Sequence, residues 1–173
     1  METATEFLMI LIPATLVMYA MFLVVRNFLQ KQFDHRLLDL KIKNNETVIP
    51  IRLQAYERIA LLLERISPNN MLIRLSDPSM SAFAFQQLLL KEIREEFNHN
   101  LSQQVYMSEE VWSKVRVTVN DIVTAVQDSA LKMDESKSAI DLAEAIFAYM
   151  ISMDRDPVGE ALSMVRNETQ HLF

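Results

Sequence analysis

The chain has 173 residues, a net charge of −6 and no cysteine, which excludes disulfide bonds, zinc–thiolate sites and thiol catalysis. Its only glycine is Gly159. Glycine-rich phosphate loops and dinucleotide-binding turns are therefore excluded, because they need several glycines to bring the backbone close to a phosphate. Residues 1–25 carry −2 and residues 26–43 carry +3, so the rest of the chain carries −7. Such an acidic remainder argues against nucleic acid as a partner.

The first predicted element is an uncharged apolar run, residues 7–25, which reads FLMILIPATLVMYAMFLVV. As a helix it would be roughly 28 Å long, close to the ~30 Å hydrocarbon thickness of a bilayer. This length predicts a single transmembrane helix within an anchor of residues 1–25. A cleaved signal peptide fits less well, because the preceding residues are acidic. A buried helix of a soluble protein is the other alternative, although the run has no polar face.

Basic residues follow this run, and the segment in front of it has no Lys or Arg. The positive-inside rule then predicts a protein of the inner (plasma) membrane, with its N-terminus outside and its C-terminal domain in the cytoplasm. Residues 26–46 are predicted to form a basic juxtamembrane helix. Its basic side chains either contact anionic headgroups or serve only as a topology signal.

Residues 47–173 are predicted to form one small helical domain, because glycine is nearly absent and good helix formers are common. A break at residues 44–47 precedes a helix over residues 51–66, whose buried stripe is Tyr56, Ile59, Leu62, Leu63 and Ile66. Ser67 and Pro68 open a short helix over residues 69–75. Asp77 and Pro78 open a long helix to about His99, with Phe83, Leu90 and Phe97 on its buried face.

Three further helices complete this domain. Ser108 caps a helix over residues 109–132, which buries Trp112, Val115, Val119, Ile122 and Val126. The next runs over residues 135–153 and buries Ile140, Ala143, Ile146, Phe147 and Met150. Asp156 and Pro157 open the last helix. The predicted fold class is therefore all-α, with a single N-terminal transmembrane helix followed by a bundle of about five amphipathic helices.

The candidate metal ligands are two Glu-x-x-His motifs, Glu96 with His99 and Glu168 with His171. Di-iron proteins of the ferritin type use this spacing on two helices. Here each motif lies at the end of its helix, where a Glu and a His are more often a solvated face. We therefore predict no cofactor, no metal site and no catalytic residue, and a metal-dependent helical enzyme remains the alternative function.

The candidate interaction residues lie opposite the buried stripe of residues 51–66. They are Glu57, Arg58, Leu61, Glu64 and Arg65, together with Tyr106 in the joint that follows His99. These residues predict an interaction or scaffolding module that binds other proteins or itself, with no small-molecule substrate evident. An envelope structural protein with its domain outside the cytoplasm is a further alternative.

Three segments of the chain carry a family resemblance. They read RLQAYER at residues 52–58, ERISPNN at residues 64–70 and NHNLSQQ at residues 98–104. With the apolar run in front of them, they resemble a family of uncharacterised small membrane-anchored proteins of Bacteroidota. The resemblance covers most of the chain, implies a bacterial inner membrane and implies no activity.

Overall fold

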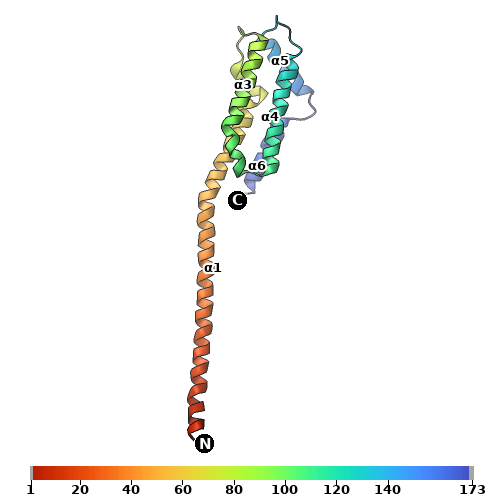
Figure 1. Ribbon diagram of the computed structural model, residues 1–173. Coiled ribbons are helices and arrows are strands. Elements are labelled where there is room, and N and C mark those ends of the chain that lie inside the picture. Colours follow the sequence, from red (N-terminus) through yellow and green to blue (C-terminus); the bar gives the residue numbers. More distant parts are fainter. Residues whose placement is uncertain (1, 172–173) are drawn as a thin grey trace. The chain divides into compact units, whose positions relative to one another are not determined.

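The computed structural model describes the backbone of residues 2–171 and the side chains of residues 15–171, except 34, 37–42, 44 and 45. This part of the chain contains seven helices and no strand, which confirms the all-α class (Figure 1). The helices are α1 (Glu2–Ile66), α2 (Pro68–Leu75), α3 (Ala82–Asn100), the 3₁₀ helix η1 (Leu101–Tyr106), α4 (Glu109–Ala130), α5 (Ala139–Ser152) and α6 (Pro157–Gln170).

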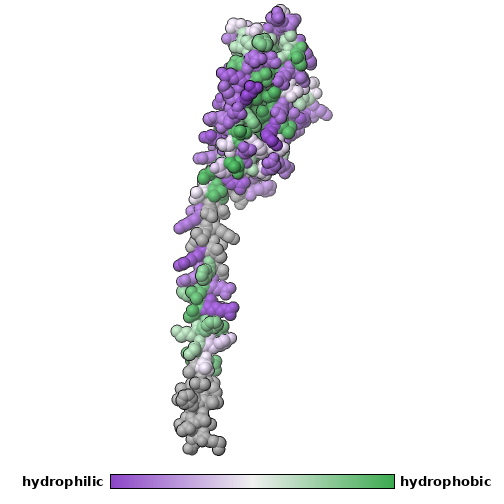
Figure 2. Space-filling view, viewed as in Figure 1, coloured by the Kyte–Doolittle hydropathy of each residue, from purple (hydrophilic) through white to green (hydrophobic). Residues whose placement is uncertain are grey.

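Contacts divide the chain into two compact units, Met1–Val48 and Ile49–Phe173. The first unit consists of the N-terminal part of α1, and large hydrophobic side chains between residues 16 and 33 are exposed on it. Figure 2 shows these side chains in green, and it shows a mainly hydrophilic face on the second unit with hydrophobic groups between.

The structure contradicts the transmembrane helix predicted over residues 7–25. Within the described residues, no helix combines the length and the apolarity that a membrane crossing requires. The side chains of residues 7–14 lie outside the described set. The inner-membrane location and the orientation that rested on this helix are corrected with it.

The buried core lies within the second unit. α3 packs against α4 and α5, α4 also packs against α5 and α6, and Figure 1 shows α3 and α4 side by side. The predicted α1 stripe is confirmed, since all five of its members are at most 2% exposed. Burial of one such Leu or Ile side chain contributes about 2 kcal/mol. The largest fully buried side chains are Phe85, Ile59, Leu62, Leu63, Ile66, Met71, Leu72, Leu89, Ile93, Ile122, Leu142 and Ile146.

Two residues that the sequence placed in the core are exposed instead. Phe83 is 70% exposed and Ile140 is 45% exposed. The buried residues of α3 are Ala82, Phe85, Leu89, Ile93 and Asn100, whereas the predicted face follows a strict spacing of seven. On a straight helix, side chains seven residues apart differ in direction by ~20°, so residues at this spacing do not all point toward the core.

Two helices begin four residues later than predicted, at Ala82 and Ala139, and their N-caps Ser81 and Ser138 form an isolated antiparallel bridge. The Ala82 N–H donates to the Lys137 carbonyl at 2.9 Å. The Ala139 N–H donates to the Met80 carbonyl, also at 2.9 Å. These bonds satisfy donors that helix starts leave free and join α3 to α5.

The break predicted at residues 44–47 is absent, because α1 continues through it to Ile66. Asn and Thr cost a helix at most about 0.7 kcal/mol each, which neighbouring turns can offset. The Thr47 hydroxyl donates to the Lys43 carbonyl at 3.2 Å, which is a contact compatible with the helix.

Candidate protein-interaction site

The carboxylate of Glu168 on α6 joins three parts of the second unit. Its Oε1 accepts hydrogen bonds from the Tyr56 hydroxyl at 2.5 Å and from the Ser108 backbone N–H at 2.7 Å. Its Oε2 accepts from the Ser108 hydroxyl. Because Tyr56 lies on α1 and Ser108 caps α4, this one carboxylate ties α1, α4 and α6 together.

The backbone carbonyl of Tyr106, at the end of η1, is held against α1. It accepts from Arg52 Nε at 3.1 Å and lies 3.2 Å from the Tyr56 hydroxyl. That hydroxyl has one proton, which is directed to the closer acceptor, Glu168, and it accepts from Arg52 at 3.1 Å. The guanidinium of Arg52 also lies 5.9 Å from the centre of the Tyr56 ring. These contacts fix the position of η1 beside α1.

This arrangement shifts the pKa of both acidic groups. Burial, and then the hydrogen bond to Glu168, raise the pKa of the Tyr56 hydroxyl. For Glu168, burial acts to raise the pKa, but hydrogen bonds from Ser108 and Tyr56 outweigh it and lower the pKa. At neutral pH the cluster therefore consists of a protonated tyrosine and an ionised glutamate, which suits a structural contact better than proton transfer.

With η1 fixed, two adjoining depressions open along one side of α1. The first, of about 360 Å³, lies between α1 and η1, and its lining includes Ile51, Val105 and Tyr106. The second, of about 600 Å³, lies between α1 and α3, and its lining includes Leu61, Arg65, Glu92, Glu95, Glu96 and His99. Arg58 lines both depressions, so they meet at its side chain. Together they are called the α1–α3 groove.

Most charged side chains of the α1–α3 groove have partners. Arg65 Nε lies 2.8 Å from Glu96 Oε2, and Glu92 lies 3.3 Å from Arg74. Arg58 makes no ion pair or hydrogen bond with any described residue. Exposed hydrophobic side chains lie near it: Ile51 is 43% exposed, Leu61 53% and Val105 76%. The groove therefore holds a free guanidinium among exposed apolar groups.

The structure brings together four of the six residues predicted for interaction. Arg58, Leu61, Arg65 and Tyr106 all line the α1–α3 groove. Glu57 and Glu64 lie on other sides of α1. Glu57 lines a depression next to α6. Glu64 accepts a hydrogen bond from the Asn70 side chain at 3.3 Å through its carboxylate.

The four candidate metal ligands do not gather at one place. Glu96 and His99 line the α1–α3 groove, where Arg65 and the Asn100 side chain already bind the Glu96 carboxylate. Glu168 belongs to the cluster described above, and His171 caps the C-terminus of α6. Over the described residues, no group of three or more His, Asp or Glu side chains could hold a metal ion.

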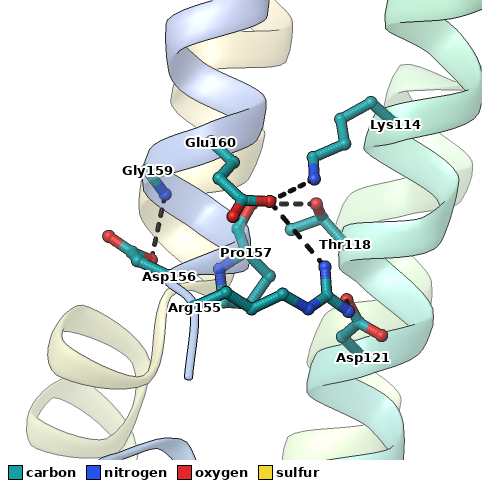
Figure 3. A network of polar contacts seen from close by, with 8 residues as sticks. All are labelled: Lys114, Thr118, Asp121, Arg155, Asp156, Pro157, Gly159 and Glu160. Carbon is teal, nitrogen blue, oxygen red and sulfur yellow. Dashed lines mark hydrogen bonds and ion pairs between the residues drawn. The ribbon is translucent and has the colours of Figure 1, made fainter. Parts of the chain in front are cut away.

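A second polar network joins α4 to the start of α6 (Figure 3). Lys114 on α4 forms an ion pair with Glu160, and Arg155 lies 2.7 Å from Asp121 and 3.8 Å from Glu160. The buried Thr118 hydroxyl donates to the Pro157 carbonyl at 3.0 Å. Because Lys114 and Asp121 on α4 pair with Glu160 and Arg155, the network fixes the start of α6 against α4.

Sequence reasoning missed the Tyr56–Ser108–Glu168 cluster. Tyr56 was assigned to the core and Glu168 to a possible metal site, while Ser108 was correctly identified as an N-cap. Its hydroxyl accepts from the Val111 N–H at 3.3 Å, as a cap does. The pairing joins residues that are 60 and 112 positions apart in the chain, so no local pattern could have indicated it.

Comparisons with known proteins give a family and no function. No curated protein matches the chain, and no solved structure matches it. One family model, described as a family of unknown function (DUF7935), matches residues 2–172, which is nearly the whole chain. The predicted resemblance to an uncharacterised family is confirmed to that extent, and the match shows neither Bacteroidota nor a membrane anchor. The chain belongs to the DUF7935 family of unknown function.

Proposed function

We propose that the Ile49–Phe173 unit is a protein-interaction module whose α1–α3 groove binds a partner protein. The observation that carries this proposal is the free Arg58 guanidinium between exposed Ile51, Leu61 and Val105. Arginine is enriched among the residues that contribute most to binding, and the buried centre of an interface is more apolar than its rim. A solvated surface with scattered charges would not require both in one groove.

The dimensions of the groove suggest the shape of the partner segment. Its α1 wall extends from Ile51 to Arg65, which corresponds to about 21 Å of helix. An amphipathic helix of roughly four turns covers that length, and helices commonly lie in such grooves with apolar anchors every three or four residues. A carboxylate on the partner, level with Arg58, would provide the charge that Arg58 lacks within its own chain.

The alternative function, a metal-dependent helical enzyme, gains no support from the described residues. Its best candidate ligand, Glu96, is bound to Arg65 and Asn100. The other motif lies on a different helix, with Glu168 in a separate hydrogen-bonded cluster. The interaction module is therefore the function we propose.

Charge reversal at Arg58 tests the proposal. The unchanged chain and the variants Arg58→Glu and Leu61→Glu are each produced in the native host and purified under mild conditions. The proteins that co-purify with each are quantified by mass spectrometry. We expect recovery of a stoichiometric partner to fall about tenfold or more in both variants, because central interface residues commonly contribute 2 kcal/mol or more.

The matched control is Arg94→Glu, an equal charge reversal at an exposed arginine of α3 that lines neither depression. This control should retain the partner at the level of the unchanged chain. Equal recovery from Arg58→Glu and Arg94→Glu would show that the α1–α3 groove does not bind the partner.

A further inference from the structure

A third depression lies on another side of α1, between α1 and α6. Its volume is about 370 Å³. The floor includes Leu53 and Ala60 from α1 and Leu162 and Val165 from α6, and the charged residues that line it are Glu57 and Arg166. It shares no lining residue with the α1–α3 groove, so it is a separate surface.

The two helices present matching patterns to this depression. α1 contributes residues 53, 56, 57 and 60, and α6 contributes residues 162, 165, 166, 169 and 170; of these, Tyr56 and Val165 are buried. The α1 set and the first four residues of the α6 set follow the spacing i, i+3, i+4, i+7, which places them on one face of a helix. The charged residue occupies the i+4 position in both sets, as an acid on α1 and as a base on α6.

Glu57 and Arg166 are exposed, and neither forms an ion pair or hydrogen bond with any described residue. α1 and α6 run antiparallel here, because Tyr56 bonds to Glu168 while Glu64, further along α1, lines a cavity with Leu162. The two exposed charges therefore lie at nearly the same level of the depression.

We propose that this depression is the interface between two copies of the chain. A two-fold interface must be self-complementary, so that each residue meets its counterpart twice. When the α1 face of one copy packs on the α6 face of the other, the partly exposed apolar residues Leu53, Ala60 and Leu162 come together. Glu57 of each copy then pairs with Arg166 of its partner. The matching patterns and opposite charges fit a second copy better than an unrelated protein.

The size of the depression indicates a reversible dimer. Stable interfaces bury about 800 Å² on each partner, and we expect this depression of about 370 Å³ to bury less. The dimer population should therefore depend on protein concentration. At protein concentrations near the dissociation constant, a change in that constant changes the fraction of dimer measurably.

The test uses charge reversal in the full-length chain, followed by sedimentation equilibrium. Glu57→Arg and Arg166→Glu should each raise the dimer dissociation constant about tenfold, because each variant creates two like-charge contacts by symmetry. The double variant restores both pairs with reversed signs, so its dissociation constant should return to within about twofold of the unchanged chain. Glu144→Arg and Arg94→Glu, which reverse exposed charges elsewhere, should leave the dissociation constant unchanged.

A second measurement identifies the contact directly, because the chain has no native cysteine. Glu57→Cys and Arg166→Cys proteins are mixed and treated with a short bis-maleimide. The mixture should give more cross-linked dimer than either protein alone, and more than a mixture of Glu144→Cys with Arg94→Cys. The proposal is overturned if the charge-reversed variants dimerise as the unchanged chain does, or if the first mixture cross-links no better than the control mixture. Partner binding that depends on Arg58 would be unaffected by either result.

Discussion

At the scale of single residues, the Glu168 carboxylate holds α1, α4 and α6 together. Its two oxygens accept from three donors on Tyr56 and Ser108, which belong to different helices. Hydrogen bonds to an ionised group are roughly twice as strong as those between neutral groups. A neutral replacement should therefore weaken the junction of α1, α4 and α6.

Glu168→Gln tests this role. A glutamine side chain can keep an oxygen on the Tyr56 hydroxyl and the Ser108 N–H, but it lacks the negative charge that strengthens these hydrogen bonds, and its N–H₂ group replaces the oxygen that accepts from the Ser108 hydroxyl. We expect the free energy of unfolding to fall by about 2 kcal/mol. Urea denaturation followed by circular dichroism measures it, with Glu144→Gln on the exposed face of α5 as the control.

The lowered pKa of Glu168 also predicts a pH dependence. Since its pKa is lower in the folded than in the unfolded chain, its contribution to stability is complete above the ordinary value of about 4.3. The contribution is lost as the pH falls through the lowered folded-state pKa. The stability gap between the unchanged chain and Glu168→Gln should therefore narrow below pH 4, and a constant gap from pH 7 to pH 3 would contradict this account.

The residue scale also shows which site residues a sequence can indicate. Arg58, Leu61 and Arg65 follow from the helical period of residues 51–66, because the face opposite a buried stripe must be exposed. Their association with Tyr106 depends on the fold of η1 against α1. The cluster around Glu168 depends entirely on that fold, since its members come from three distant helices.

At the scale of helices, the starts of α3 and α5 illustrate how capping fixes a boundary. The Ser138 hydroxyl accepts from the Asp141 N–H at 3.4 Å, and the Asp141 carboxylate accepts from the Ser138 N–H at 2.8 Å. This reciprocal pair is a capping box. The Ser138 backbone N–H and hydroxyl both donate to the Asp141 carboxylate, and these two bonds lower its pKa. The prolines at positions 78 and 157 are more conspicuous helix-start signals in the sequence than these serines. Of the two, Pro157 begins a helix and Pro78 does not.

Ser138→Ala tests the value of this cap. The variant leaves the Asp141 N–H without its acceptor, so we expect the free energy of unfolding to fall by about 1 kcal/mol. Ser163→Ala is the control, because Ser163 is exposed within α6 and alanine there should be neutral or slightly stabilising. If both variants unfold at the same urea concentration, the capping box does not stabilise the start of α5.

At the scale of the whole molecule, the division at Val48 has a thermodynamic consequence. Every residue of the buried core cluster lies between Tyr56 and Val165, within the second unit. About 125 residues are enough to bury a core of their own. The second unit should therefore fold without the first.

A fragment of residues 49–173 tests this prediction. We expect it to unfold cooperatively in urea, with the same midpoint for the far-ultraviolet circular dichroism signal and for the fluorescence of Trp112. The full-length chain should show the same midpoint for Trp112, because that side chain is buried in the second unit. A fragment without a cooperative transition would mean that residues before Ile49 are required for the core.

The sequence by itself determined the helical class, the α1 stripe from Tyr56 to Ile66 and the helix that begins at Pro157, because periodicity and capping act over a few residues. It wrongly predicted a transmembrane helix over residues 7–25, a break at residues 44–47 and a buried Phe83. Only the tertiary structure decided the start of α3, through backbone hydrogen bonds to the α5 segment, and the position of η1, through Arg52 and Tyr56. These contacts join residues far apart in the chain, so they form and stabilise the protein only once the helices are packed.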